Sequence, residues 1–335
     1  MNNKFWKSKI TIVTGANGFV ASHITINLLT QGAKVIGVIK EYIPGSYLEQ
    51  YVKSNRPKNL KLVKGDISDY LFIKRLFIKN EPDFCFHVAA QAIVGIANKT
   101  PIPTFKTNIE GTWNILDAVR EFSPSTAVVV ASSDKAYGEH KKLPYTEEAS
   151  LQAMHPYDAS KACTDILART YAHTYGLPVA VTRCANIYGP GDLNFSRIIP
   201  DTIRSAILDK NPIIRSDGTP LRDYIFIGDI VRAYLMLAMN LALHKPEISG
   251  EAFNFGSGKP ISVLGLVELI LDVAAKTGLR PVILSKRKIK GEIDKQYLSS
   301  AKAKRLLGWS CKNSLRQGLA KTLEWYREYV FSCLK

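Results

Sequence analysis

The sequence predicts an α/β protein built on a doubly wound parallel sheet, with a smaller C-terminal lobe. Three observations predict it: five short runs rich in Val, Ile and Ala, amphipathic segments between them, and a glycine-containing turn directly after the first run. Strands of a parallel sheet are covered on both faces, so they are apolar throughout and do not alternate. Because helices alternate with such strands, a ligand is expected at the carboxyl ends of the strands.

The predicted strands and helices follow from these patterns. The strands are residues 9–13, 33–39, 60–65, 82–90 and 126–131. Apolar residues at helical spacing mark the core-facing sides of two helices. They are Val20, Ile24 and Leu28 in the first helix and Ile109, Trp113 and Leu116 in a later one.

The composition is that of a globular protein, with 335 residues, 46% hydrophobic and 22% charged. The net charge of +16 is compatible with nucleic acid, a membrane surface or an anionic small molecule as partner. Lys and Arg are scattered along the chain and form no tail or single basic helix, which argues against nucleic acid. A substrate that carries a pyrophosphate would be attracted by the same field.

The chain lacks the signals of export, membrane insertion and metal binding. Its N-terminus has no apolar region of signal-peptide length, and nowhere do about eighteen apolar residues run together. We therefore expect a soluble, cytoplasmic protein with no membrane partner. The five cysteines include no CxxC pair, so reduced thiols are expected and a metal site is not.

The turn after the first strand reads "TGANGFVAS", residues 14–22. Gly15 and Gly18 have the spacing that lets the backbone approach a pyrophosphate, while the next helix presents its N-terminal N–H groups to it. Ala21 keeps the helix close to the strand. We therefore predict a dinucleotide site, here and at the ends of the following strands. Its residues are Gly15, Asn17, Gly18, Phe19, Val20, Lys40, Asp66, Ile67, Ala89 and Ala90.

The end of the second strand bears on which nicotinamide dinucleotide binds. NAD-binding sheets commonly place an acid there for the adenosine ribose, but this chain has Ile39 and Lys40, with Glu41 one step further. An ammonium near the 2′ position favours a 2′-phosphate, so NADP is slightly favoured over NAD. Alternatively, Lys40 is solvated and NAD binds without an acid that accepts from the adenosine ribose. Asp66 is suited to accept from the adenine amino group or, equally, to cap a helix.

A helix predicted from Pro156 to Gly176 carries Tyr157 and Lys161, four residues apart and on one face. An ammonium beside a phenol favours the phenolate, which would let the tyrosine act as a base near neutral pH. An isolated YxxxK is a common accident. The motif is a strong signal of a catalytic pair when it follows a predicted sheet whose glycine turn binds a dinucleotide.

At this point the chain resembles the extended short-chain dehydrogenase/reductases over nearly its whole length. The blocks that carry the resemblance are "TGANGFVAS", "HVAAQ", "TNIEGT", "SSDKAYG", "YDASK", "RCANIYGPGD", "RDYIFIGDIVRAY", "FNFGSG" and "KAKRLLGW". The resemblance implies a Rossmann fold and an active site of Ser133, Tyr157 and Lys161. Lys161 would also bond the nicotinamide ribose, Ser133 the sugar hydroxyl being oxidised, and Asn108 would help to position Lys161 or a water.

The same resemblance implies a nucleotide-sugar substrate. It places Gln91, Asn108, Asn186 and Arg222 at the substrate, with Asn186 and Arg222 at its phosphates. Arg is a preorganised phosphate donor and Asn can donate an amide N–H, in agreement with this assignment. For Arg222 the alternative is an ion pair with Asp223 or Asp217. A lysine of residues 285–292 is a further phosphate ligand that the pattern suggests.

The reaction is read from "SSDKAYG", residues 132–138, which follows the last predicted strand. By the resemblance, simple C4 epimerases have small hydroxylic residues after the catalytic Ser, whereas 4,6-dehydratases have ionisable groups. Asp134 and Lys135 are such a pair, and Asp-Lys looks like the CDP-glucose 4,6-dehydratases. For Lys135 to be the C5 base it must be neutral part of the time, and Asp134 must hold a proton to act as acid.

The resulting prediction is a nucleotide-sugar 4,6-dehydratase, with CDP-glucose favoured and GDP, dTDP or UDP sugars left open. The alternative is a C4 epimerase or another sugar-nucleotide oxidoreductase. A more remote alternative is a non-catalytic NADP-sensing or nucleic-acid-binding protein, although such relatives generally lose the catalytic Tyr or Lys.

The resemblance also implies the division of the chain and its assembly. Residues 1–186 would form the dinucleotide-binding domain, to which 221–258 return, and residues 187–220 and 259–335 the substrate lobe. A homodimer is expected, packed through the helices that contain "TNIEGTWNILDAV" and "YDASKACTDILA". The apolar faces of these helices could instead be buried against the sheet.

Overall fold

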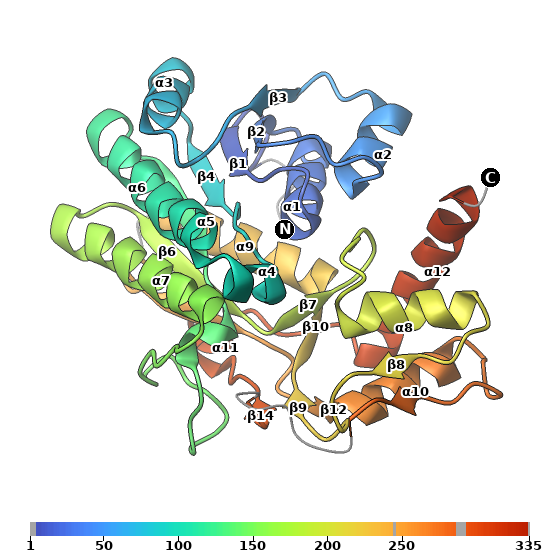
Figure 1. The fold of residues 1–335 in the computed structure, drawn as a ribbon. Coiled ribbons are helices and arrows are strands. Elements are labelled where there is room, and N and C mark those ends of the chain that lie inside the picture. The colour runs from blue at the N-terminus through green and yellow to red at the C-terminus, as the bar shows by residue number, and fades with distance from the viewer. Residues whose placement is uncertain (1–4, 244–245, 286–292, 334–335) are drawn as a thin grey trace.

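The computed structural model describes residues 5–243, 246–285 and 293–333, and its centre is a seven-stranded sheet (Figure 1). The strands stand in the order β11-β6-β5-β4-β1-β2-β3, and every neighbouring pair is parallel. Their bounds are β1 (Ile10–Thr14), β2 (Lys34–Ile39), β3 (Leu60–Lys64), β4 (Phe84–His87), β5 (Ala127–Ala131), β6 (Val179–Cys184) and β11 (Ala252–Phe255). The chain winds outward in both directions from β1, so the predicted doubly wound fold is confirmed.

Two details of the sheet differ from the prediction. β4 ends at His87, earlier than the predicted residue 90, because the Thr14 hydroxyl accepts hydrogen bonds from the amides of Val88 and Ala89 at 3.0 and 3.1 Å. The edge strand β3 is not covered on both faces, since Leu62 is 44% exposed. β6 and β11 extend the sheet beyond the five strands read from the sequence.

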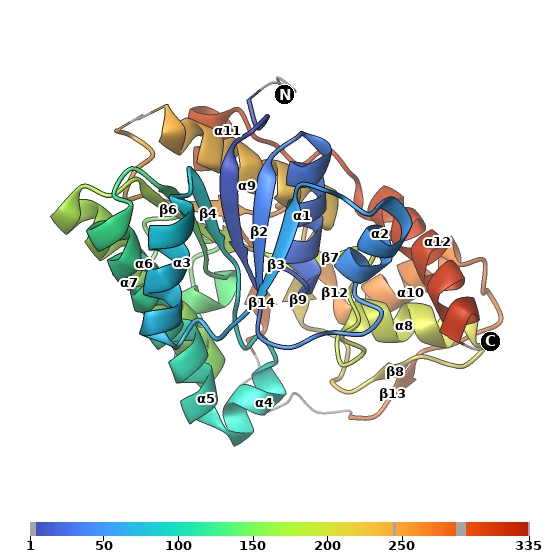
Figure 2. The same cartoon turned by 90° about the horizontal axis from the view of Figure 1, so that it is seen from above.

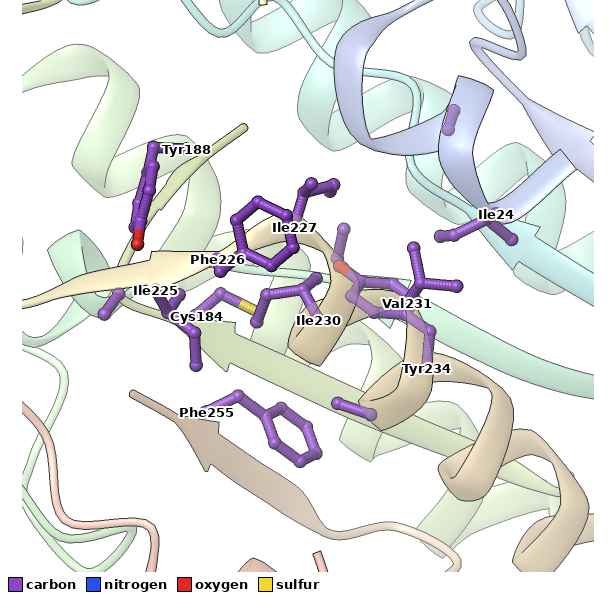
Figure 3. Close-up of a cluster of buried hydrophobic side chains, with 14 of the residues drawn as sticks. Ile24, Cys184, Tyr188, Ile225, Phe226, Ile227, Ile230, Val231, Tyr234 and Phe255 are labelled. Atoms are coloured by element: carbon purple, nitrogen blue, oxygen red, sulfur yellow. The ribbon is translucent and has the colours of Figure 1, made fainter. Parts of the chain in front are cut away.

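Helices cover both faces of the sheet and enclose two separate hydrophobic cores (Figures 1 and 2). One face carries α1 (Phe19–Thr30) and α9 (Ile227–Ala242), and the other carries α3 (Tyr70–Asn80), α6 (Gly111–Phe122) and α7 (Pro156–Tyr175). Figure 3 shows the start of α9, where Ile227 and Ile230 lie among Cys184 of β6, Phe255 of β11 and Ile24 of α1. This packing joins the last strand of the sheet to the first helix.

One predicted core residue faces outward. Trp113 is 42% exposed, whereas Ile115 and Leu116 are buried. The segment is not one continuous α-helix: α5 (Pro101–Phe105) runs into a π-helical turn at Lys106–Glu110 before α6 begins. A π turn adds a residue to the helical repeat, which changes the face presented by the residues that follow it.

The C-terminal part of the chain forms a second layer beside the sheet (Figure 1). The helices α8 (Ile198–Ile207), α10 (Val263–Val273) and α12 (Leu315–Cys333) contact one another. Short strands connect them: β8 (Ile213–Ile214) pairs with β13 (Val282–Ile283), and β9 (Leu221–Arg222) lies between β12 (Ile261–Ser262) and β14 (Lys295–Gln296). β7 (Asn186–Tyr188) and β10 (Tyr224–Phe226) pair at the junction with the sheet.

The remaining helices complete the description. They are α2 (Tyr47–Asn55), α4 (Val94–Lys99), the 3-10 turn η2 (Asp134–Tyr137) and α11 (Ala301–Leu307), which contacts β11 and α9. No helix in the described part of the chain has the length and apolar character needed to cross a bilayer.

Candidate functional site

A cavity of about 1180 Å³ lies at the carboxyl ends of the central strands and continues to the start of α8. Most of the residues predicted from the sequence line it. They are Gly15, Asn17, Gly18, Phe19, Val20, Lys40, Asp66, Ile67, Ala89, Ala90, Ser133, Asp134, Lys135, Tyr157, Lys161 and Asn186. Gln91, Asn108 and Arg222 do not line it.

The glycine turn fits a pyrophosphate. Gly15 has φ +68°, and a Cβ added there would lie 2.9 Å from Cα of Ala89, so no larger residue is accommodated without a shift. Gly18 is the N-cap of α1 and provides no side-chain cap, which leaves the first N–H groups of the helix available to an anion. The backbone N–H groups at this end of the cavity are therefore suited to bind the pyrophosphate of a dinucleotide.

The end of β2 carries an ion pair in place of the usual ribose acid. Lys40 Nζ lies 2.8 Å from Asp66 Oδ2, and Lys40 is 60% exposed. Burial works against ionisation of Asp66, but Lys40 and the Ser68 amide hold its pKa below the ordinary value. Asp66 also accepts from the amide of Ser68 at 3.0 Å, two residues on, so it stabilises a turn. The N-cap of α3 is Asp69, not Asp66.

Three consecutive residues leave the end of β5 and enter the cavity. The Ser133 hydroxyl caps η2 by accepting from the amide of Lys135 and donates to Asp134 Oδ1 at 3.1 Å. Asp134 is 1% exposed, and Oδ2 has no hydrogen-bond partner among the described residues. Burial raises the pKa of Asp134, while the charges of Lys135 and Arg222 and the Ser133 hydrogen bond oppose the shift. The net shift is upward, the direction that an acid requires.

Tyr157 and Lys161 both line the cavity, on the first turns of α7. The Lys161 ammonium donates to the carbonyl of Ala131 at 2.7 Å, and burial lowers its pKa to about 8. The protein atoms packed around the Tyr157 hydroxyl raise its pKa to about 12. Arg197 and a Ser133 hydrogen bond oppose that shift, and Asp134 and Asp158 add to it. Burial thus dominates the pKa of Tyr157, and the effect of the Lys161 ammonium on the phenol stays a prediction.

A buried ion pair contacts the turn η2 on the side away from the cavity. Arg183 donates to both carboxylate oxygens of Asp165, at 2.7 and 2.8 Å, and to the hydroxyl of Tyr137 at 2.9 Å. Tyr137 in turn donates to Asn254 Oδ1 at 2.7 Å. Since Tyr137 is fully buried and points away from the cavity lining, it holds η2 in place.

Three predicted substrate residues lie elsewhere. The Asn108 amide joins the backbone of Gln91 to the hydroxyl of Ser160, at 2.8 Å to the latter, so it supports the α7 turn next to Lys161 without touching Lys161. The Gln91 side chain donates to the carbonyl of Ile93. The Arg222 guanidinium donates to the carbonyls of Leu221 and Asp294 at 3.0 and 3.4 Å. Residues 286–292, which include the suggested phosphate lysines, lie outside the described residues.

Asn186 occupies the cavity wall on β7. Its side-chain amide and its backbone N–H both donate to the carbonyl of Asp223, each at 3.1 Å. This fixes the Asn186 side chain at the junction between the sheet and the second layer.

Three residues at the site were not predicted. Arg197, at the start of α8, lines the cavity and forms an ion pair with Asp192 at 2.9 Å. Asp158 is 6% exposed, burial raises its pKa, and the charge of Lys135 opposes the shift. Gln296 accepts a hydrogen bond from Lys135. Only Asp158 has a sequence signal, its place directly after Tyr157.

Comparison with known proteins adds a family to this geometry. The model of the GDP-mannose 4,6 dehydratase family matches residues 12–322. A trifunctional UDP-glucose 4,6-dehydratase/UDP-4-keto-6-deoxy-D-glucose 3,5-epimerase/UDP-4-keto-L-rhamnose-reductase of Arabidopsis thaliana is 30% identical, over 96% of this chain and 48% of that protein. The chain thus spans about half the length of the Arabidopsis relatives that it matches.

Solved structures agree in fold over nearly the whole chain. The UDP-glucose 4-epimerase of Thermotoga maritima with UDP-glucose superposes with a TM-score of 0.85 at 31% identity, covering 96% of this chain and 99% of that one. The dTDP-glucose 4,6-dehydratase of Bacillus anthracis in complex with NAD gives a TM-score of 0.83 at 28% identity, covering 98% and 100%. Both a dehydratase and an epimerase thus share this fold.

Proposed function

The chain belongs to the NAD-dependent epimerase/dehydratase family of extended short-chain dehydrogenase/reductases, and from this membership we propose that it is a nucleotide-sugar 4,6-dehydratase. CDP-glucose is the favoured substrate, on the strength of the Asp134–Lys135 dipeptide. The product would be the nucleotide-linked 4-keto-6-deoxyhexose.

One observation carries the proposal: a buried acid and a lysine stand side by side at the end of β5, in the same cavity as Ser133 and Tyr157. C4 epimerisation needs only removal and return of a hydride at C4. A 4,6-dehydration also needs a base for the C5 proton and an acid for the departing C6 hydroxyl. Asp134 and Lys135 supply these two groups.

The glycine turn and the N-terminus of α1 would hold the dinucleotide pyrophosphate, and Lys161 its nicotinamide ribose. A bound oxidised nicotinamide would supply a positive charge and the acceptor for the C4 hydride, which would be returned to C6. Tyr157 takes the C4 hydroxyl proton, with Ser133 bonded to the same oxygen. Lys135 takes the C5 proton and later returns it, and Asp134 protonates the C6 oxygen, which leaves as water.

Ser133 would carry the proton that must pass from Tyr157 to Asp134 after each turnover. Each turnover leaves Tyr157 with one added proton and Asp134 with one fewer, so a proton must pass from the phenol to the carboxylate. Ser133 lines the same cavity as Tyr157 and donates to Asp134 Oδ1 at 3.1 Å. Its hydroxyl would receive a proton from one residue and give one to the other.

The direct test is to incubate the protein with CDP-, dTDP-, GDP- and UDP-hexoses and either NAD or NADP. Loss of water from CDP-glucose, observed by mass spectrometry, is the expected result. Turnover of none of these sugars would overturn the proposal.

A C4 epimerase is the second candidate, favoured by the fold match to the Thermotoga maritima UDP-glucose 4-epimerase. The same incubation separates the two. An epimerase would give a product of unchanged mass with altered configuration at C4, visible by NMR.

We further propose that NADP binds somewhat more tightly than NAD, because Lys40 follows β2 directly, with a side chain that is 60% exposed and an ammonium paired with Asp66. Replacing Lys40 by Ala is expected to weaken NADP binding about tenfold, since a charge-assisted phosphate contact is lost. The affinity for NAD should change much less. Titration of both dinucleotides followed by tryptophan fluorescence measures the ratio, and an equal loss for NAD and NADP would contradict the preference.

We also propose a homodimer packed through α6 and α7. Trp113 on α6 and Ile166 on α7 are 42% and 54% exposed, and Ile102 on the preceding α5 is 70% exposed. Large apolar side chains gathered on neighbouring helices are typical of an interface.

Replacing both Trp113 and Ile166 by Glu is expected to convert the dimer to a monomer in size-exclusion chromatography with light scattering, because two charges would be buried. The control is Val282→Glu on β13, which is exposed to a similar extent but lies in the other layer. If the double Glu variant were still a dimer, the interface would not lie on α6 and α7.

A further inference from the structure

The amino group of Lys135 is tied to the C-terminal layer. Lys135 Nζ donates to Gln296 Oε1 at 3.3 Å, across 161 residues of sequence. Gln296 is 1% exposed, whereas Lys135 is half-buried and lines the cavity. The turn that follows β5 and the strand β14 therefore meet at a partly buried hydrogen bond.

The backbone that carries Gln296 is held on two sides. In the pairing of β14 with β9, Gln296 stands opposite Arg222, and the amide of Asp223 donates to the Gln296 carbonyl at 3.2 Å. The neighbouring Tyr297 carbonyl accepts from the amide of Tyr145 at 3.0 Å. A side chain presented by a backbone fixed in this way can set the position of its partner.

An amide oxygen is a suitable acceptor for a lysine that acts as a base. Both the ammonium and the neutral amine can donate to it, so the contact orients Nζ without fixing its charge. The carboxyls whose charge interacts with Lys135 are Asp134 on η2 and Asp158 on α7, and Arg222 on β9 acts in turn on Asp134. A carboxylate at position 296 would add a third acid to this group.

The other end of the amide has no protein partner. Gln296 Nε2 is buried and makes no hydrogen bond to a described residue. A buried donor without a partner is unfavourable. Asp134 Oδ2 and Asp158 Oδ1 are likewise buried and make no hydrogen bond to a described residue. Of these three residues, Asp134 lines the cavity.

We propose that Gln296 is a positioning residue for dehydration: its amide oxygen orients Lys135 for abstraction of the C5 proton. This proposal rests on the proposed function. Abstraction of the C5 proton would then depend on the contact between Gln296 of the β9–β14 strand pair and Lys135 of the turn η2.

The test uses the full chain with CDP-glucose in deuterium oxide. Gln296→Leu is expected to slow water loss and deuterium incorporation at C5 by about 10- to 100-fold, because Lys135 loses its orientation. The KM and the single-turnover reduction of the nicotinamide, which reports C4 oxidation, should stay within about twofold. Lys295→Ala, a change at the exposed neighbour on the same strand, is the matched control.

A second variant tests orientation separately from folding. Gln296→Glu keeps an acceptor of the same shape but favours the charged form of Lys135, so the pH optimum of water loss should rise by about one unit. The optimum of C4 oxidation should not move. An unchanged optimum for water loss in this variant would contradict the proposal.

The outcomes separate the two hypotheses. If Gln296→Leu eliminates water at the normal rate while Lys135→Ala does not, the role of Gln296 is overturned and the proposed function stands. Equal loss of oxidation and elimination in Gln296→Leu would indicate a structural role and also overturn it. If the unaltered protein releases no water from any nucleotide sugar, the proposed function fails, and the role of Gln296 fails with it.

Discussion

Replacement of Asp134 by Asn is expected to slow water elimination at least about 100-fold and to leave oxidation at C4 largely intact. Asn has nearly the same shape but cannot supply an acidic proton to the departing hydroxyl. Asp134 is suited to that role because burial raises its pKa. The 4-keto hexose should therefore accumulate before water is lost, and rapid quench with mass spectrometry would detect it.

The control for this experiment is Tyr157→Phe, which should lose C4 oxidation itself, since the phenol that takes the hydroxyl proton is removed. The two variants thus stop the reaction at different steps. An Asp134→Asn protein that releases water at the normal rate would exclude Asp134 as the acid.

Replacement of Asp165 by Leu is expected to lower the free energy of unfolding by about 3–5 kcal/mol. Arg183 and Asp165 are at most 1% exposed, and their two hydrogen bonds are the compensation for burying two charges. Removal of Asp165 leaves the guanidinium buried with only Tyr137 and the Glu147 carbonyl as acceptors. Urea denaturation followed by circular dichroism measures the change.

The double variant Asp165→Leu with Arg183→Met should recover much of the lost stability, because neither charge remains. Asp272→Leu is the surface control. It breaks an ion pair with Arg316 in which both side chains are 59% exposed, and should change stability little. If Asp165→Leu were as stable as the unaltered protein, the buried pair would not anchor the turn η2.

Local patterns in the sequence were sufficient to predict much of the fold. The runs that become β1, β2 and β5 are apolar, and the turn at Gly15 and Gly18 follows β1 directly. The helix that carries Tyr157 begins at Pro156 and ends before Gly176, which adopts a left-handed conformation. Such signals lie within a few residues of the element they define.

The failures have a different origin. Trp113 is 42% exposed although Leu116 of the same helix is buried, and the π turn before this helix was not predicted from periodicity. Arg222 does not line the cavity, and its guanidinium bonds to carbonyls of its own layer, so its role at a phosphate stays a prediction. The spacing of Tyr157 and Lys161 did not reveal that burial raises the pKa of Tyr157 to about 12, because spacing says nothing of how many atoms enclose a side chain.

The sequence by itself determined the order of strands and helices, the glycine turn, and the presence of Ser133, Asp134 and Lys135 after an apolar run. These features depend on neighbouring residues. Only the tertiary structure decided that Asp134 is buried, which raises its pKa, and that Gln296 is the partner of Lys135. The physical reason is that burial and contacts across 161 residues arise from packing, which no local pattern records.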